Sequence, residues 1–336
     1  MSPKLLLSII VCLPVWAQTE NAPAPAALPA RKGQPIVNTP ELQAQAAKLR
    51  ALVEAAPKAA LERTQIKIQS PGSGWELAYP SAVTMDDEGL FYILQRGDKA
   101  DPVLVVDKDG KIVRSWGKGM YEIPHSIRID PQGNIWTTDS GSSMIYKFTP
   151  QGKKLMEIAV GEQPPGRTTG ARGTSDICFG PNGRIFISDG YGNARILEYN
   201  AKGERVHQWG SAGKGPGQFA QPHGIAIDDQ NILYVADRLN NRLQKFDMTG
   251  KYLGEWDDLG QVTAVAFRDG NLWIGTQFSN ENTESDGWHM KIDRETGKIL
   301  AYVVSGHSHH VLNITKKGEL LAGARPDIPW YFHLAK

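Results

Sequence analysis

The stretch HSIRIDPQGNIWTTDSGSSMIYKFTPQGKKLMEI, residues 125–158, shows the unit from which most of the chain is built. It reads as four short strands separated by turn signals such as Pro-Gln-Gly, with an aspartate at the end of the second strand. The same layout returns at residues 175–209 and 223–256. The first residue of each copy, which we call the opening residue, keeps a constant spacing to this aspartate. The pairs are His125 and Asp139, Ser175 and Asp189, and His223 and Asp237.

Three weaker copies share this layout and bring the number of repeats to six. Their opening residues are Ser81, Val262 and His309, so that successive openings are separated by 44, 50, 48, 39 and 47 residues. A period of about 40–50 residues with four short strands is typical of a propeller blade. We therefore predict an all-β, six-bladed β-propeller over residues 65–336. Because the last copy is short, we expect TQIKIQS, near residues 64–70, to supply its outer strand and close the ring.

The N-terminal part is predicted to be a signal peptide followed by a leader. Residues 1–17 combine Lys4 with a short apolar run and end in Val-Trp-Ala, a small-residue cleavage signal. Residues 18–64 form an Ala/Pro-rich linker and one or two helical pieces, with Pro57 as a break. We expect a periplasmic or secreted protein without a transmembrane segment. Cys12 is preceded by Val11 rather than a small residue, which argues against lipid attachment.

Charge and cysteine content exclude several partners. Thirty-seven Lys and Arg residues balance 36 Asp and Glu residues, so no strong field would draw the chain to nucleic acid or an anionic membrane. Removal of the signal peptide leaves Cys178 as the only thiol, which we expect to be buried and inert, with no intrachain disulfide. We expect a monomer.

The opening residues predict a metal site. In order they read Ser, His, Ser, His, Val and His, so every second blade should direct an imidazole toward the propeller axis. Three histidines with an open fourth position are typical of catalytic zinc, although iron, cobalt or copper would also accept nitrogen ligands. A lone histidine at the start of a strand more often packs or bonds locally; the shared register is what favours ligation. The predicted ligands are His125, His223 and His309, with His307 and His310 as alternatives to the last.

Four segments also resemble a known family: IPHSIRIDPQGNIWTTD, IFISDGYGNARILEYN, GQFAQPHGIAID and LYVADRLNNRLQKFD. They are similar to the NHL-repeat propeller of the peptidyl-α-hydroxyglycine α-amidating lyases (peptidylamidoglycolate lyases), and the similarity spans roughly residues 75–325. In that family three histidines bind zinc, and the matching residues here are His125, His223 and His309. The resemblance implies a carbon–nitrogen lyase that cleaves a peptidyl-α-hydroxyglycine, or a related carbinolamine, to an amide and glyoxylate.

The resemblance also implies three catalytic residues. Tyr191 matches a tyrosine that takes the substrate hydroxyl proton, and Arg96 and Arg238 match arginines. An arginine fork suits a carboxylate, so the partner would be a peptide or small molecule that carries one. All three lie just beyond the end of the second strand in their copies of the repeat, which places them on loops beyond the innermost strand pair. The alternatives are an inter-blade salt bridge for each arginine and a channel cap for the tyrosine.

The sequence departs from the family at three positions. Gly192 follows the tyrosine, where the family has a cysteine. His310 stands in place of an aspartate that helps to hold structural calcium, and His307 in place of a methionine. These departures argue against calcium in the channel and leave room for a changed substrate. No copper monooxygenase domain precedes the propeller, so we expect another protein to supply any hydroxylated substrate.

Two other functions compete with the lyase. One is a non-catalytic propeller that binds a protein, peptide or glycan, with the histidines holding a structural ion. The other is a calcium-dependent lactonase, but calcium prefers oxygen ligands and the opening residues offer nitrogen.

Overall fold

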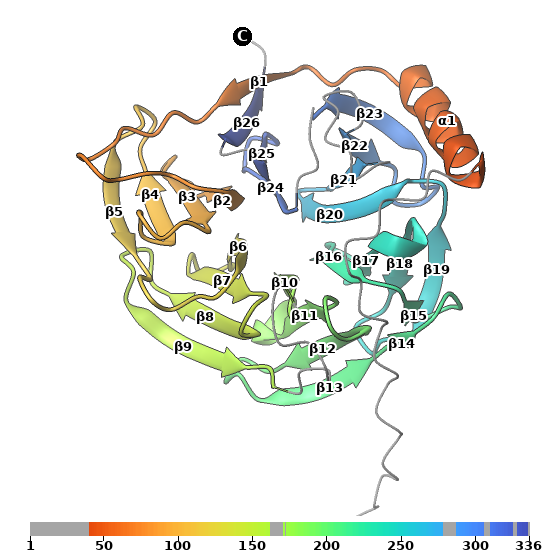
Figure 1. Ribbon diagram of the computed structural model, residues 1–336. Helices are drawn as coiled ribbons and strands as arrows, with labels where there is room; N and C mark the ends of the chain where they lie inside the picture. Colours follow the sequence, from red (N-terminus) through yellow and green to blue (C-terminus); the bar gives the residue numbers. More distant parts are fainter. Residues whose placement is uncertain are drawn as a thin grey trace, which may run out of the picture.

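The computed structural model describes residues 40–161, 171, 173–277, 287–305, 310–324 and 328–334. Six antiparallel four-stranded sheets surround a central axis, which confirms the predicted all-β six-bladed propeller (Figure 1). The proposed signal peptide, residues 1–17, lies outside the described residues.

In every blade the strands follow one another outward from the axis. Blade 1 contains β2 (Pro80–Met85), β3 (Phe91–Gln95), β4 (Val103–Val106) and β5 (Ile112–Trp116), and blade 2 contains β6 (Pro124–Ile129), β7 (Ile135–Asp139), β8 (Met144–Phe148) and β9 (Lys154–Ala159). Blade 3 contains β10 (Asp176–Phe179), β11 (Ile185–Asp189), β12 (Arg195–Tyr199) and β13 (Arg205–Trp209), and blade 4 contains β16 (Pro222–Ile227), β17 (Leu233–Asp237), β18 (Arg242–Phe246) and β19 (Tyr252–Trp256). Blade 5 contains β20 (Gln261–Arg268), β21 (Asn271–Gln277), β22 (Gly287–Ile292) and β23 (Ile299–Val304), and blade 6 contains β24 (Leu312–Ile314), β25 (Leu320–Ala324), β26 (Ile328–Leu334) and β1 (Leu61–Gln65). A short parallel pair, β14 (Ser211–Ala212) and β15 (Gln218–Phe219), precedes blade 4.

The ring closes through a strand from the N-terminal side of the propeller. β1 pairs antiparallel with β26, so blade 6 is completed from both ends of the domain, as expected. The closing strand is Leu61–Gln65, however, and not residues 64–70. The alternating pattern after Gln65 has a different cause, because Ile66 and Ile68 pack into the core of blade 1.

Neighbouring blades are joined by a repeated tryptophan–glycine contact. Gly152 in blade 2 has a φ of 86°, and a Cβ there would lie 2.8 Å from the ring of Trp116 in blade 1. Glycine is therefore required both by its left-handed backbone and by the approach of the indole. Two later interfaces repeat the contact, Trp209 with Gly250 and Trp256 with Gly297.

The helix α1 (Pro40–Ala55) packs on the outside of the ring next to blade 5 (Figure 1). Leu49 and Val53 bury its apolar side in the core shared by blades 4 and 5, and the helix ends before Pro57, as predicted. No helix in the described part of the chain is long and apolar enough to cross a bilayer. Cys178 is buried with a free thiol, and burial raises its pKa.

Candidate metal centre

The site is built at the start of the innermost strands, where β6 and β16 each contain an irregularity. In blade 2, Pro124 pairs with Asp139 and Ser126 pairs with Thr138, which leaves His125 as an extra residue between them. In blade 4 the register shifts between Pro222 and Ile225, around His223. A β-bulge bends the strand and redirects a side chain. The bulges therefore turn these side chains out of the ladder.

The repeated aspartate at the end of the second strand fixes the backbone in front of each histidine. In blade 2, Asp139 accepts hydrogen bonds from the backbone N–H groups of Glu122 (2.7 Å) and Ile123 (2.6 Å). In blade 4, Asp237 accepts them from Ala220 (2.9 Å) and Gln221 (3.4 Å). Charge-assisted bonds of this kind are among the stronger ones in proteins. The aspartate at this repeated spacing therefore holds the backbone segment that sets the positions of His125 and His223.

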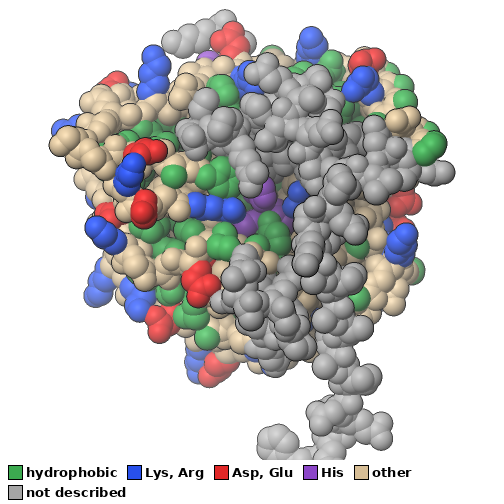
Figure 2. Space-filling view, viewed as in Figure 1, with side chains coloured by type: hydrophobic (Ala, Val, Ile, Leu, Met, Phe, Trp, Pro, Cys, Tyr) green, Lys and Arg blue, Asp and Glu red, His purple; other side chains and the backbone are tan. Residues whose placement is uncertain are grey.

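Three histidines converge at the axis: His125, His223 and His310. Their ring centroids lie 5.0, 5.5 and 5.6 Å apart, and one nitrogen from each lies within 4.8 Å of the others. Figure 2 shows histidine side chains at the centre of this face, beside basic ones. His125 and His223 are 0 % exposed.

Hydrogen bonds to Nδ1 orient all three rings. The Nδ1 atoms of His125 and His223 lie 2.6 Å from backbone carbonyl oxygens of the following blade, those of Ser175 and Thr263. The Nδ1 atom of His310 lies 2.8 Å from the hydroxyl of Tyr79. With Nδ1 engaged, Nε2 is the nitrogen left for a ligand. Metal-binding histidines usually have such a partner on the other nitrogen.

The environment keeps the imidazoles neutral, as metal ligation requires. Burial lowers the pKa of His223 to about 3, and the positive charge of Arg238 adds to the effect. The pKa values of His125 and His310 are also well below the usual range, mainly through burial and then through the other histidines. The residues thus fit a divalent ion that prefers nitrogen: three neutral imidazoles, oriented from behind, with no carboxylate among the described members of the cluster.

The third member of the cluster is His310, the alternative ligand from the sequence. His307 and His309 lie outside the described residues. The structural equivalent of the opening in blade 5 is Thr263, one residue later than predicted, since its carbonyl oxygen lies beside Nδ1 of His223 as the Ser175 carbonyl oxygen lies beside Nδ1 of His125. This copy lacks the terminal aspartate from which the register was counted.

The predicted tyrosine lies between two of the histidines. The Tyr191 hydroxyl is 2.9 Å from Nε2 of His125 and 2.9 Å from Nε2 of His223. It therefore occupies the point at which the imidazoles meet, on the loop after β11, as its place in the repeat predicted.

Both predicted arginines lie close enough to act on the site. The charges of Arg96 and Arg238 contribute to the lowered pKa values of all three histidines. Arg96 donates from Nε to the Pro124 carbonyl (3.0 Å). Within the described residues Arg238 forms no ion pair, and its Nε has no hydrogen-bond partner, which argues against the salt-bridge alternative.

Sequence reasoning missed Tyr79. This residue bonds to His310, and its ring lies under the guanidinium of Arg96, 4.6 Å from the ring centroid. It precedes the opening residue of blade 1 and repeats in no other blade, so no pattern identified it. The other described histidines lie apart from the cluster: His289 is buried against Phe332, His207 is exposed and His333 is half-buried.

A cavity of about 630 Å³ opens at the opposite end of the channel. Part of its apolar lining comes from one equivalent position near the end of each innermost strand, and no described histidine lines it. The six residues are Met85, Ile129, Phe179, Ile227, Phe267 and Ile314. This cavity is therefore separate from the candidate metal centre.

The chain matches a family model described as a 6-bladed beta-propeller over residues 170–318. It is 32% identical to a probable peptidyl-α-hydroxyglycine α-amidating lyase of Caenorhabditis elegans over 231 residues, 64% of this chain and 65% of that protein. It is 30% identical to the mouse peptidyl-glycine α-amidating monooxygenase over 82% of this chain but only 34% of that protein. A streptogramin B lyase structure shares the fold, with a TM-score of 0.56 and 18% identity over 82% of this chain and 98% of that one.

The family model, the similarity to the amidating lyases and the six sheets of the structure agree with one another. The chain is thus a six-bladed β-propeller whose sequence is similar to the peptidyl-α-hydroxyglycine α-amidating lyases, and it spans less than two thirds of the length of the relatives it matches.

Proposed function

We propose that this protein is an exported, zinc-dependent lyase that cleaves the C–N bond of a peptidyl-α-hydroxyglycine, or a related carbinolamine, to an amide and glyoxylate. The supporting observation is the position of the Tyr191 hydroxyl, 2.9 Å from the Nε2 atoms of two buried histidines. The homologous proteins named as amidating lyases support the same reaction.

His125, His223 and His310 would hold the ion. Three imidazoles and an open fourth position are typical of catalytic zinc. Zinc bound there would act as a Lewis acid toward the hydroxyl or carboxylate of the substrate. An all-nitrogen cluster disfavours the calcium-dependent lactonase, because calcium takes oxygen ligands.

Tyr191 is the proposed general base. It takes the proton of the substrate hydroxyl beside Arg96 and Arg238, whose positive charges also act on the neighbouring histidines. The electron pair left on that oxygen forms the carbonyl of glyoxylate, and the C–N bond breaks toward nitrogen. The amide nitrogen then takes up one proton, so the reaction balances without an oxidant or reductant.

Arg238 or Arg96 is the proposed carboxylate anchor. A guanidinium can grip a carboxylate through two parallel N–H donors, which fixes orientation as well as charge. Arg238 suits this role because its Nε is without a hydrogen-bond partner and it forms no ion pair within the described residues. Arg96 is held more firmly by the Pro124 carbonyl and the ring of Tyr79.

The experiment combines metal analysis with an assay for glyoxylate released from a short α-hydroxyglycine peptide. The wild type should bind one zinc and release glyoxylate, His223→Ala should lose both, and Tyr191→Phe should keep the metal and lose most of the activity. Metal content unchanged in His223→Ala would contradict the site. A wild type that holds zinc without releasing glyoxylate would contradict the lyase and favour a non-catalytic binding propeller.

A further inference from the structure

The axis of the propeller is occupied by a buried arginine directly below the histidines. Arg128 lies on β6, three residues after His125, and is 8% exposed. All five of its N–H donors are matched by acceptors. Nε and Nη2 bond to the two carboxylate oxygens of Asp176 (3.0 and 2.5 Å), Nη1 bonds to the Leu312 carbonyl (2.6 Å) and Asn313 Oδ1 (2.9 Å), and Nη2 also bonds to the Val265 carbonyl (3.3 Å).

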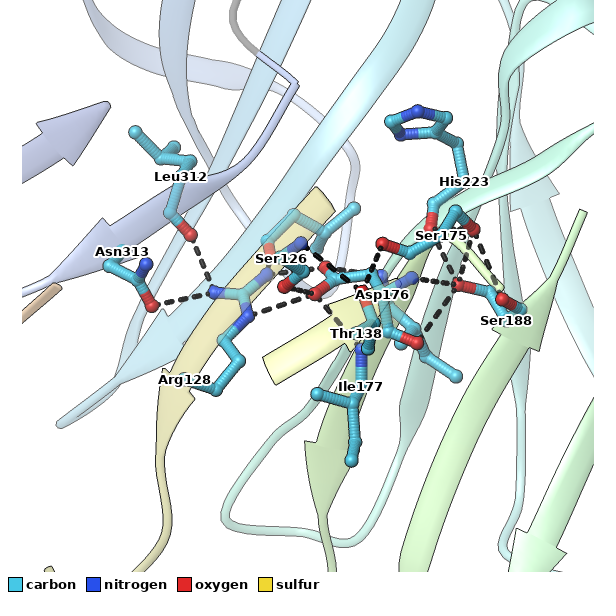
Figure 3. A network of polar contacts seen from close by, with 12 residues as sticks. Ser126, Arg128, Thr138, Ser175, Asp176, Ile177, Ser188, His223, Leu312 and Asn313 are labelled. Atoms are coloured by element: carbon cyan, nitrogen blue, oxygen red, sulfur yellow. Dashed lines mark hydrogen bonds and ion pairs between the residues drawn. The ribbon is translucent and has the colours of Figure 1, made fainter. Parts of the chain in front are cut away.

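The acceptors extend this contact to every blade. Asp176, which is 1% exposed, also accepts bonds from the Ser126 hydroxyl (2.6 Å) and the backbone N–H of Ile225 in blade 4 (3.3 Å). Asn313 donates from Nδ2 to the carbonyls of Val83 in blade 1 (2.7 Å) and Ile127 in blade 2 (3.2 Å). Arg128, Asp176 and Asn313, which we call the axial hub, therefore link the innermost strands of all six blades. Figure 3 shows the three residues side by side, with Arg128 between Asp176 and Asn313.

The acceptors around Arg128 are those that a hard metal cation would use. They comprise one carboxylate, one side-chain amide oxygen and two backbone carbonyls, and calcium takes six to eight oxygen ligands of these types. A guanidinium already neutralises the carboxylate and fills the space, so calcium does not fit here. A buried charge pair of this kind is strongly destabilised when one partner is removed, because the other charge is left unpaired.

We propose that Arg128 is a built-in cation that takes the place of a structural metal ion at the propeller axis. The chain then needs no calcium to hold its blades together. Removal of the guanidinium exposes five oxygen acceptors, so Arg128→Ala should turn the propeller into a calcium-binding protein. This inference is independent of the reaction catalysed at the histidines.

The test is the melting temperature of metal-stripped protein, with zinc restored to every sample so that only calcium varies. The wild type should show no shift with calcium. Arg128→Ala should melt about 10 °C lower, from the usual cost of an unpaired buried charge in a domain of this size. About 1 mM calcium, near 100 times a Kd of about 10 µM, should restore roughly half of that loss.

Three variants separate this role from a general loss of packing. Arg128→Ala combined with Asp176→Asn should not respond to calcium, because the carboxylate is gone. Arg184→Ala is the matched control: Arg184 also bonds to a carboxylate and a carbonyl, those of Glu198 and Met248, but away from the axis and with its own side chain 28% exposed, and its variant should not respond either. Arg128→Lys keeps the charge with fewer donors and should melt between Arg128→Ala and the wild type without a calcium response.

Two results would overturn the proposal even if Arg128→Ala does not fold. One is a wild-type melting temperature that rises when calcium is restored. The other is Arg128→Lys as stable as the wild type, since a single ammonium cannot match five acceptors. A folded Arg128→Ala protein that ignores calcium would overturn it as well.

Discussion

Replacing Tyr79 with phenylalanine tests how the third ligand is held. The rings of His125 and His223 are oriented by backbone carbonyls, which no substitution removes, whereas the ring of His310 is oriented by the Tyr79 hydroxyl at 2.8 Å. Tyr79→Phe deletes only that hydroxyl and keeps an aromatic ring under the guanidinium of Arg96. The change therefore removes the hydrogen bond behind one proposed metal ligand.

The expected effect follows from that single bond. Loss of a partner behind a ligating histidine typically lowers metal affinity about 10- to 100-fold, or about 1.4–2.7 kcal/mol. The measurement is zinc competition against a chromogenic chelator at neutral pH. Tyr121→Phe is the matched control, since its hydroxyl bonds to Thr137 Oγ1 at 2.8 Å rather than to a histidine. Its zinc affinity should equal that of the wild type.

If Tyr79→Phe binds zinc within about twofold of the wild-type affinity, the loss is well below the expected range and the reasoning is refuted. It would mean that His310 does not supply the third nitrogen. Two alanine variants then identify the ligand directly. His310→Ala should lose most of its zinc affinity and His309→Ala should keep it; the reverse result would return the third position to His309.

Three further perturbations probe the fold and the proposed substrate contact. Burial lowers the pKa of His289 to about 3, so below pH 6.5 the unfolded chain binds a proton that the folded chain does not, and stability is lost as the pH falls. His289→Gln should remove this loss of stability at low pH. Between about pH 6 and 4, its free energy of unfolding in denaturant titrations should fall by roughly 2.5 kcal/mol less than that of the wild type. Equal falls in the two proteins would contradict this. Asp237→Ala leaves the buried Arg242 paired with Glu255 alone and removes the acceptor of the Ala220 backbone N–H, so it should cost about 3 kcal/mol in denaturant unfolding. Asp247→Ala, in a turn near the surface, should cost about 1 kcal/mol, and equal losses would count against the role of Asp237 in holding the backbone. If Arg238 holds the substrate carboxylate, Arg238→Ala should lower kcat/KM about 10- to 150-fold with metal content unchanged, and an unaltered kcat/KM would exclude that role.

The local parts of this molecule could be predicted from the sequence. Strands, turns and the aspartate at a constant spacing from each opening depend on neighbouring residues, so the repeat was visible in one blade and recurred in the others. His125 and His223 were located because Asp139 and Asp237 mark their register. The same reasoning was one residue off in blade 5, where no aspartate ends the second strand.

What only the tertiary structure decided are the contacts that cross the axis. Tyr79 reaches His310 across 231 residues of sequence, and Arg128 reaches Leu312 across 184. Several of these partners are backbone carbonyls, which every residue carries and no side-chain pattern marks. A repeat specifies each blade by itself, but which groups meet at the centre depends on closing the ring.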